Sequence, residues 1–261
     1  MGSDSRIDPT ARVHEDARLA EDVEVGAYSV IGADVEIGSG TRVGPHAVVH
    51  GPTRIGRDNR IFQFVSLGED PQHRGYQGEP TRLEIGDRNS FREFCSVHRG
   101  TTLDEGVTRI GDDNLLMAYC HIAHDCVLGN GVTMANGASL AGHVRVGDHC
   151  ILGGFALVYQ FVHVGTLAFL GYGSGVSHSV PAFVRCSGYP AKPHGINSVG
   201  MRRHGYDDSD VTAMKHAYRV LYRSKLRLEE AKARLADDAA GNAAVKEFLA
   251  SLEASERGVI R

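Results

Sequence analysis

The stretch VGAYSVIGADVEIGSGTRVGPHAVV, residues 25–49, carries an aliphatic residue at every sixth position. These residues are Val25, Ile31, Ile37, Val43 and Val49. The same spacing extends from residue 7 to residue 67, runs again from 85 to 97, and continues one register later from 110 to 176. A short period that persists over most of a chain predicts a solenoid.

A period of six fits neither an α-helix at 3.6 residues nor a plain strand at two. It suits a prism with three flat walls, in which three hexapeptides make a coil of about 18 residues. Glycine often follows the aliphatic residue, which predicts tight backbone approach and unusual dihedrals at the corners. Coils stacked about 4.8 Å apart would give a column of roughly 45 Å. We therefore expect an all-β parallel β-helix.

Two interruptions divide the repeat, near residues 68–84 and 99–109. Both are polar and rich in glycine, so we expect loops that leave the column at a corner and carry function. The period ends near residue 187, just before the segment GYPAKPHG. We expect a β-helix over residues 1–190 and a C-terminal α-helical domain over 191–261.

The C-terminal region shows helical periodicity. One predicted helix face contains Val211, Met214, Tyr218, Leu221 and Leu228. The candidate N-terminal caps are Asp208, Ser209 and Asp210. A second helix is predicted over about 243–254. Basic residues spaced by four, Lys215, Arg219, Arg223 and Arg227, form a stripe that is either a solvated face or a docking surface for an acidic carrier protein.

Composition excludes several classes of protein. The net charge of −4 argues against general nucleic-acid binding. The polar start MGSDSRIDPT lacks the apolar core of a signal peptide, and no run of 18 apolar residues predicts a membrane span. The five cysteines fall at the small inward position of the repeat and include no CxxC. They are expected to be buried core residues in a reducing cytoplasm, not nucleophiles or zinc ligands.

The chemistry concentrates in MAYCHIAHDC, residues 117–126, and LAGH, residues 140–143. His124 is the third residue of its hexapeptide and should point outward, beside Asp125. Gly142 follows three hexapeptides later and should stack on His124 in the next coil. An imidazole base, a carboxylate that orients it and an unobstructed backbone N–H would suffice for acyl transfer to a hydroxyl. Histidines grouped in this way could instead bind zinc.

The chain resembles a known family in its motifs. IGRDNRIFQFVSLGE, GEPTRLEIGDRN, HRGT, IGDDNLLM, HIAHDC, LAGHVRVGD and AYRVLYRS look like the UDP-N-acetylglucosamine 3-O-acyltransferases of lipid A biosynthesis. The resemblance extends through the helical tail to the closing RGVIR. It implies a left-handed coil, against the usual right-handed preference of crossovers. It also implies a cytoplasmic homotrimer that uses acyl carrier protein and a UDP-sugar and needs no cofactor or metal.

The resemblance assigns roles to individual residues. It places the general base on His124, the assisting carboxylate on Asp125 and the oxyanion donor on Gly142. Substrate contacts fall on Gln72, His73, His121, His143, Tyr159, Gln160, Asn197, Arg203 and His204. The position that ends the acyl groove is Tyr172, where a long-chain relative has glycine, and this implies a shorter acyl chain. Independently of the resemblance, the basic stripe predicts carrier-protein docking on Lys215, Arg219 and Arg223.

The departures from the family pattern lie on the sugar-nucleotide side. His73 and Gly75 replace the usual Asp and Lys of the first loop, Tyr159 replaces a His, and Val199 and His204 replace a Glu and an Arg. The acceptor could therefore be the 3-hydroxyl or the 3-amino form of the sugar nucleotide.

Three other interpretations remain. A zinc-dependent γ-class carbonic anhydrase uses the same solenoid. The N-acyltransferase of the following lipid A steps normally has an extra N-terminal domain, for which residues before 7 leave no room. A structural or ice-binding solenoid would have flat threonine rows, and these walls are irregular and charged.

Overall fold

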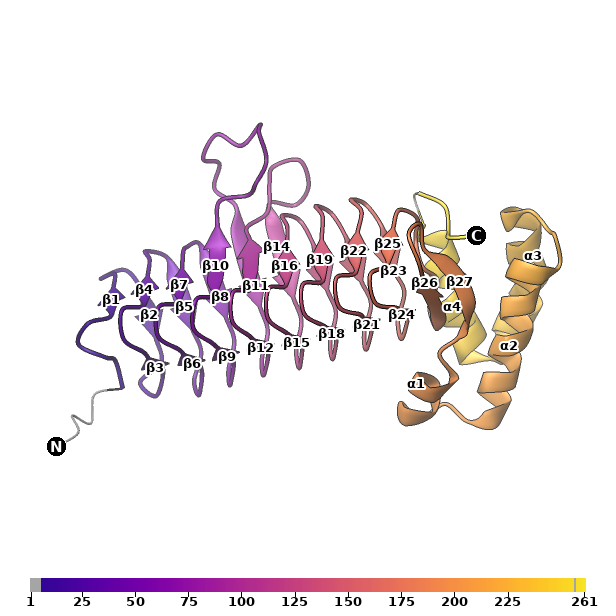
Figure 1. Cartoon of the computed structure of the whole chain (residues 1–261), viewed down its shortest axis with the longest axis horizontal. Coiled ribbons are helices and arrows are strands. Elements are labelled where there is room, and N and C mark those ends of the chain that lie inside the picture. The colour runs from indigo at the N-terminus through magenta and orange to yellow at the C-terminus, as the bar shows by residue number, and fades with distance from the viewer. Residues whose placement is uncertain (1–5, 256) are drawn as a thin grey trace.

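The computed structural model describes residues 6–255 and 257–261. Over these residues the chain winds a left-handed parallel β-helix of three sheets, followed by a helical region at one end of the column (Figure 1). The predicted fold class is confirmed. None of the helices is both long and apolar enough to cross a membrane, over the residues that the structure describes.

Each sheet forms one wall of the column. The first wall contains β1 (Arg12–Val13), β4 (Val30–Ile31), β7 (Val48–Val49), β10 (Ser66–Glu69), β13 (Ser96–His98), β16 (His121–Ile122), β19 (Ser139–Leu140), β22 (Leu157–Val158) and β25 (Gly175–Val176). The second wall contains β2 (Arg18–Leu19), β5 (Val35–Ile37), β8 (Thr53–Ile55), β11 (Arg82–Ile85), β14 (Val107–Ile110), β17 (Val127–Leu128), β20 (Arg145–Val146) and β23 (His163–Val164). The third wall contains β3 (Glu24–Val25), β6 (Arg42–Val43), β9 (Arg60–Ile61), β12 (Ser90–Phe91), β15 (Leu115–Leu116), β18 (Thr133–Met134), β21 (Ile151–Leu152), β24 (Phe169–Leu170), β26 (Val184–Ser187) and β27 (Lys192–Ile196).

The strand pairing within each wall gives the length of a regular coil and the lengths of the two insertions. Thr133 pairs with Ile151, three hexapeptides further along the chain, as the period predicts. Ser66 pairs with Ser96 instead of position 84, so the first insertion lengthens its coil by two hexapeptides. Ser96 pairs with His121 instead of position 114, so the second insertion lengthens its coil by one hexapeptide and one further residue. The extra residue explains the change of register in the sequence. The segments between β10 and β11 and between β13 and β14 project from the same side of the column (Figure 1).

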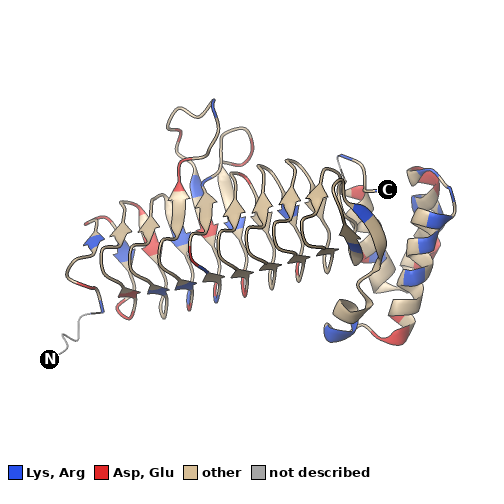
Figure 2. Cartoon of the chain, in the orientation of Figure 1, with Lys and Arg blue, Asp and Glu red and all other residues tan. Residues whose placement is uncertain are grey.

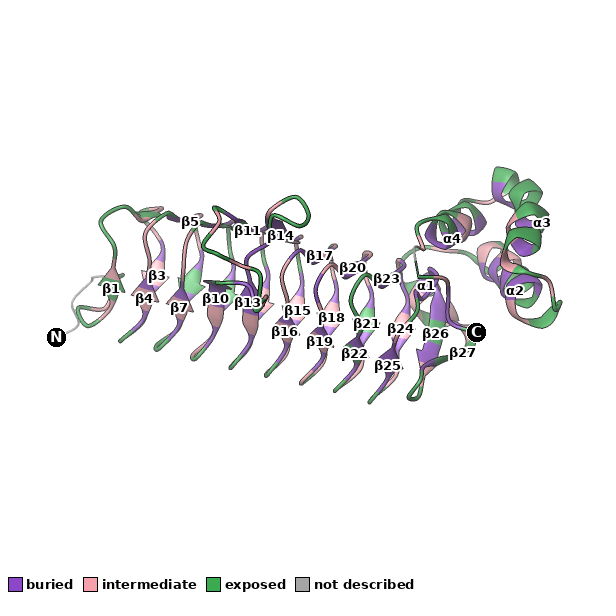
Figure 3. Ribbon diagram, turned by 90° about the horizontal axis from the view of Figure 1, so that it is seen from above, coloured by how far each residue is buried: buried purple, intermediate pink, exposed green. Residues whose placement is uncertain are grey.

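The core lies inside the column. The aliphatic residue of each hexapeptide is buried through most of the repeat, as Ile31, Leu67, Ile122 and Leu140 illustrate, and small inward residues such as Ala138 are buried with them. Figure 3 shows buried residues along the strands of the column. All five cysteines are buried and free. Burial raises the pKa of the Cys126 thiol to about 12, so this sulfur carries no thiolate at neutral pH.

The corners use glycine differently from the prediction. The glycine after the aliphatic residue provides close approach, because a Cβ on Gly38 would lie 2.7 Å from the Gly56 carbonyl oxygen of the next coil. The left-handed backbone conformation lies two positions later, usually on a residue other than glycine, such as Tyr28 at φ 59° and His46 at φ 56°. The prediction that these glycines carry the unusual dihedrals is wrong. Aromatic corner residues stack along the column instead, with ring centroids 5.1 Å apart for Phe64 and Phe94.

Among the described residues, the helical region contains α1 (Ser198–Arg203), α2 (Asp208–Arg223), α3 (Leu228–Gly241) and α4 (Ala243–Glu253). Asp207 caps α2 and forms a reciprocal capping box with Asp210, so the cap precedes the three residues proposed from the sequence. Leu228 begins α3 and does not continue the buried face of α2. The sequence did not predict α1 or α3.

A ladder of buried asparagines joins three coils on the corner before the third wall. The Asn89 amide donates to Gly111 O at 2.9 Å and to Asn59 Oδ1 at 3.1 Å, and Asn89 Oδ1 accepts the Asn114 backbone N–H at 2.9 Å. Asn89→Ala removes the partners of the half-buried Gly111 carbonyl and of the buried Asn114 N–H.

We expect Asn89→Ala to lower the free energy of unfolding by about 3 kcal/mol. The urea midpoint measures this loss. Asn136→Ala provides the matched control, because Asn136 is exposed and its side chain makes no hydrogen bond among the described residues. Equal midpoints for the two variants would show that the ladder contributes nothing.

Candidate active site

A histidine–aspartate pair lies on the corner between β16 and β17. His124 Nδ1 lies 2.8 Å from Asp125 Oδ2. Because an ionised carboxylate only accepts hydrogen bonds, Nδ1 holds the proton and donates it to Asp125. The other ring nitrogen, Nε2, is therefore left with a free lone pair. A neutral imidazole in this tautomer is suited to accept a proton.

Asp125 is fixed by the second insertion. Its side chain is fully buried and accepts hydrogen bonds from the Thr101 backbone N–H at 2.7 Å and the Thr101 hydroxyl at 2.6 Å. Its own backbone N–H donates to Thr108 Oγ1 at 2.8 Å. Burial alone would raise the pKa of the Asp125 carboxyl, but the hydrogen bonds from His124 and Thr101 hold it below the usual value. The carboxylate thus stays ionised and rigid beside the imidazole.

Gly142 stacks on His124 in the next coil. A Cβ on this glycine would lie 2.6 Å from His124 Cε1 and 2.9 Å from Nε2, so any side chain here would collide with the imidazole. The Gly142 backbone N–H makes no hydrogen bond to any of the described residues. A free N–H beside the basic nitrogen is a suitable donor for an oxyanion.

Two further histidines, His73 and His143, lie against the His124 ring. The His143 ring stacks on Phe161 at 4.5 Å between centroids, and its Nδ1 lies 3.4 Å from Asp104 Oδ2. The His73 ring meets the His124 ring edge-on at 5.5 Å. The first and second insertions therefore both reach the His124 corner.

Ligand atoms of His124, Asp125 and His143 lie within 4.8 Å of one another and could approach one cation. However, both oxygens of Asp125 already accept hydrogen bonds from Thr101, and His124 Nδ1 faces the carboxylate itself. In a metal site the histidine nitrogen and the carboxylate oxygen would each face the ion. The geometry therefore fits a hydrogen-bonded pair better than a set of metal ligands.

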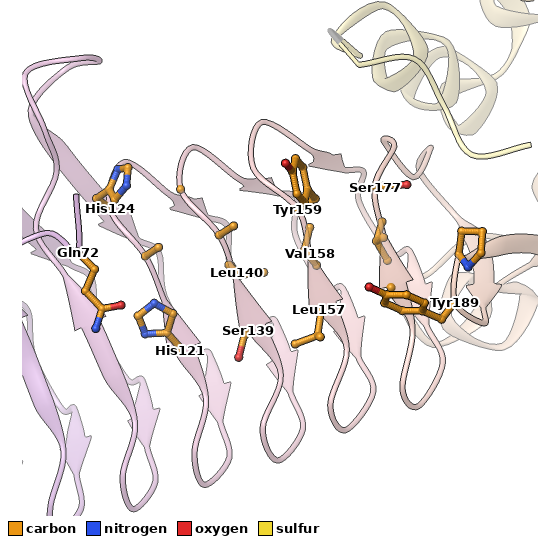
Figure 4. Close-up of a pocket in the computed structure, with 16 residues that line it drawn as sticks. Gln72, His121, His124, Ser139, Leu140, Leu157, Val158, Tyr159, Ser177 and Tyr189 are labelled. Atoms are coloured by element: carbon orange, nitrogen blue, oxygen red, sulfur yellow. The ribbon is translucent and has the colours of Figure 1, made fainter. Parts of the chain in front are cut away.

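A pocket of about 640 Å³ extends from this corner along the first wall (Figure 4). Its polar end contains Gln72, His121 and His124, Leu157 lies midway along it, and its far end contains Tyr189 and Pro190 (Figure 4). Gly142 and Tyr159 also line it. A long pocket with a polar reacting end and an apolar extension suits an acyl chain that is held by a polar head.

His121 forms part of the polar end. Its Nδ1 lies 2.8 Å from Ser96 Oγ in the preceding coil, and its ring meets the buried ring of His98 edge-on at 5.2 Å. Burial, together with the nearby His98 and His124, lowers the pKa of His121 to about 4. His121 is therefore neutral at physiological pH.

Other predicted substrate residues do not reach this pocket within one chain. Gln160 is exposed on the corner above Gly142. Asn197 caps α1 by accepting the Gly200 N–H at 3.0 Å, and its amide donates to Leu167 O at 2.9 Å. Arg203 is exposed at the end of α1, and the His204 ring packs against His149 at 4.3 Å. Asn197, Arg203 and His204 lie at the helical end of the molecule and do not line the pocket.

Tyr172 lies on the corner between β24 and β25, with 78 % of its surface exposed. Its ring contacts Phe155 edge-on at 6.2 Å and does not line the pocket. The apolar end is bounded instead by Tyr189, whose ring covers Gly175, because a Cβ there would lie 2.0 Å from Tyr189 Cδ2. Sequence reasoning missed Tyr189, although it lies in the quoted segment GYPAKPHG.

Arg99 anchors the first insertion and was also missed. Its buried guanidinium donates to Gly51 O and Asp70 and to the Tyr76 hydroxyl, the last at 3.1 Å. Asp70 and Tyr76 flank Gln72 and His73, so Arg99 holds the loop that carries them beside His124. Arg99 and Thr101 belong to the HRGT motif, which was the available signal.

The basic stripe Lys215, Arg219 and Arg223 lies exposed along α2 (Figure 2). None of the three makes an ion pair with another described residue. The fourth residue of the predicted stripe, Arg227, lies outside α2 and caps the start of α3. Lys215, Arg219 and Arg223 therefore form the continuous part of the stripe.

The repeat and the site together define a hexapeptide-repeat transferase. The family model described as bacterial transferase hexapeptide matches residues 16–51 and 107–142. The model described as UDP N-acetylglucosamine O-acyltransferase, domain 2, matches residues 180–260.

Whole-chain relatives identify the family. A Halorhodospira halophila protein named acyl-(acyl-carrier-protein)–UDP-N-acetylglucosamine O-acyltransferase is 59 % identical to this chain over 257 residues. The match covers 98 % of this chain and 100 % of the relative. This chain is 56 % identical to the protein of the same name from Thiobacillus denitrificans, covering 98 % and 99 %. The solved UDP-N-acetylglucosamine O-acyltransferase of Moraxella catarrhalis superposes with a TM-score of 0.96 at 40 % identity, covering 98 % and 100 %. The chain belongs to the family of acyl-(acyl-carrier-protein)–UDP-N-acetylglucosamine O-acyltransferases.

Proposed function

We propose that this protein transfers a 3-hydroxyacyl group from acyl carrier protein to the 3-hydroxyl of UDP-N-acetylglucosamine, the first step of lipid A biosynthesis, with His124 as general base. The observation that carries the proposal is the tautomer of His124. Its Nδ1 donates to the buried Asp125 carboxylate at 2.8 Å and leaves Nε2 basic beside the free N–H of Gly142.

The proposed reaction is direct transfer. His124 Nε2 takes the proton of the sugar 3-hydroxyl while its oxygen attacks the thioester carbonyl carbon. The carbonyl oxygen becomes an oxyanion that accepts the Gly142 N–H. Collapse of this intermediate breaks the carbon–sulfur bond, and the proton held by His124 passes to the leaving thiolate of the carrier. Asp125 stabilises the imidazolium between these two proton transfers.

We further propose that the active enzyme is a cytoplasmic homotrimer. Asn197, Arg203 and His204, which the family pattern assigns to substrate binding, lie at the helical end of the chain and do not line the pocket of His124. A cyclic arrangement would allow the helical region of one subunit to complete the pocket of its neighbour. The open first wall would then be covered by a second column.

A transfer assay tests the function and the acceptor together. Purified protein is given 3-hydroxyacyl carrier proteins of graded length, each with UDP-N-acetylglucosamine or its 3-amino analogue. Transfer to the hydroxyl sugar supports the proposal. Transfer only to the amine would keep the mechanism and change the acceptor. Without transfer to either, the zinc hypothesis would be next, and the metal content of the protein would decide it.

The acyl-length proposal concerns Tyr172. In an assembled trimer a neighbouring column would extend the pocket past the corner where this ring lies. A phenol there shortens the space that is available to the end of the acyl chain. We therefore expect Tyr172→Gly to shift the preferred donor to a longer acyl chain by several carbons. The relative kcat/KM of the donors should change about tenfold, because each buried methylene contributes about 0.8 kcal/mol. Competition between donors of graded length measures the shift. Unchanged selectivity would transfer the role to another residue, with Tyr189 as the first candidate.

Carrier-protein docking is tested by charge reversal on α2. We expect Lys215→Glu combined with Arg219→Glu to raise KM for acyl carrier protein about tenfold or more and to leave kcat nearly unchanged, because docking charges act mainly on encounter. The acyl-pantetheine thioester without the protein should react equally well with both enzymes. Arg234→Glu combined with Lys246→Glu, at exposed positions of α3 and α4, is the matched control, because it changes the net charge by the same amount. An equal effect of the control would indicate a general effect of net charge.

A further inference from the structure

The neutral His121 has a defined hydrogen-bond partner on one side only. Its Nδ1 lies 2.8 Å from Ser96 Oγ, which is the only side-chain contact found for this hydroxyl within the described residues. His121 Nε2 makes no hydrogen bond there and is not a fully buried atom, so it is accessible from the pocket that His121 lines. Figure 4 shows His121 beside Gln72 at the polar end of the pocket.

The direction of the Ser96 hydrogen bond decides where the His121 proton lies. A hydroxyl can donate one proton and also accept, whereas a neutral imidazole has one donor and one acceptor nitrogen. If Ser96 accepted from Nδ1, its own proton would have no partner among the described residues. If Ser96 donates to Nδ1, the hydroxyl is satisfied and the single ring proton must lie on Nε2. The second arrangement moves the unpaired donor from the Ser96 hydroxyl to His121 Nε2, where a molecule bound in the pocket can accept it.

Three features fix the protonation and the orientation of the His121 ring. The pKa of His121 is about 4, so the second proton that would make both nitrogens donors is absent. The His98 ring, buried and perpendicular at 5.2 Å, restricts rotation. Ser96 and His121 also stand directly opposite each other in the first wall, on β13 and β16, so the backbone register sets their spacing.

We propose that Ser96 is a positioning residue that holds His121 in the Nε2–H tautomer, so that His121 donates a hydrogen bond to an uncharged oxygen of the bound substrate. This inference rests on the proposed acyl transfer and deepens it. His121 lies three positions before the general base His124, at the end of the pocket where the reacting groups must meet. The oxygen belongs either to the 3-hydroxyl of the acyl donor or to the sugar nucleotide.

The tautomer is measured directly on the full protein with ¹⁵N-labelled histidine. Neutral imidazole nitrogens with and without a proton have well-separated ¹⁵N shifts, and a His121→Gln variant assigns the signals. Wild-type protein should show the proton on Nε2. Ser96→Ala should give a mixture of tautomers, and Ser96→Thr, which keeps the hydroxyl, should restore the wild-type pattern. This readout needs no activity, so it remains informative even if the proposed reaction is wrong.

Kinetics then locate the acceptor oxygen. Ser96→Ala should lower kcat/KM about tenfold, the loss expected for one net hydrogen bond, and Ser96→Thr should recover it. If the loss disappears with a donor that lacks the 3-hydroxyl, the acceptor is that hydroxyl. If it persists and appears in KM for the sugar nucleotide, the acceptor is on the sugar. Ser90→Ala, at the equivalent strand position on the third wall, is the control.

Three results would overturn the inference. One is a wild-type His121 with its proton on Nδ1, which would make Ser96 an acceptor. A second is a Ser96→Ala enzyme with a mixed tautomer but unchanged kinetics for every donor and acceptor, which would leave the hydrogen bond a purely structural contact. Loss of activity in Ser96→Thr as well as Ser96→Ala, with the tautomer intact, would likewise assign Ser96 to packing.

Discussion

We expect His124→Ala to lower kcat/KM for acyl transfer by about a thousandfold and to leave the fold unchanged. A positioned general base contributes roughly 10²–10⁴ to the rate, and here the base is aligned by a buried carboxylate. The imidazole is on a corner of the column, outside the hydrophobic core, so its removal opens no core cavity. Activity should fall while the thermal midpoint stays within a few degrees of the wild type.

The control for this variant is His178→Ala. His178 occupies the same corner position three coils further along, is exposed and touches Ser177 through its Nδ1 at 3.1 Å. It should retain full activity. A His124→Ala enzyme with near-normal kcat would exclude general-base catalysis by this residue. In that case His143, which lies 3.7 Å from the same Asp125 oxygen through its Nε2, becomes the candidate base.

The repeat made the column predictable because its signal is redundant. Every coil supplies three aliphatic positions, so one substitution such as Phe91 does not hide the period. The coil length of three hexapeptides then placed Gly142 against His124, as the structure shows. Handedness was not accessible in this way. It came from the family resemblance, since periodicity is the same in either hand.

The site was predictable where it follows the regular register and was missed where it depends on the insertions. Thr101 and Asp125 meet only because the second insertion lengthens its coil and folds back onto the corner. Ser96 and His121 face each other across the same lengthened coil. The regular hexapeptide spacing does not predict either contact. The helical region had no repeat to support it, which is why α1 and α3 were missed.

Gly142→Ala should reduce kcat about a hundredfold without loss of stability. The added methyl would lie 2.6 Å from His124 Cε1, and the obstructing atoms are the ring of a side chain that can move. The backbone can therefore stay in place while the imidazole rotates away from Asp125. A misplacement of about 1 Å of a catalytic group costs on the order of 10² in rate, and crowding of the Gly142 N–H weakens the oxyanion contact as well.

A double mutant separates the two effects of this methyl group. If Gly142→Ala acts only by displacing the base, adding it to His124→Ala produces no further loss, because there is no ring to displace. If it also weakens the oxyanion contact, the double mutant is slower than His124→Ala alone, by the factor that the N–H contributes. Gly241→Ala, where a Cβ meets nothing within 4 Å, controls for the substitution itself. A Gly142→Ala enzyme with wild-type kcat would remove both roles from this corner and contradict the proposed geometry of the transfer.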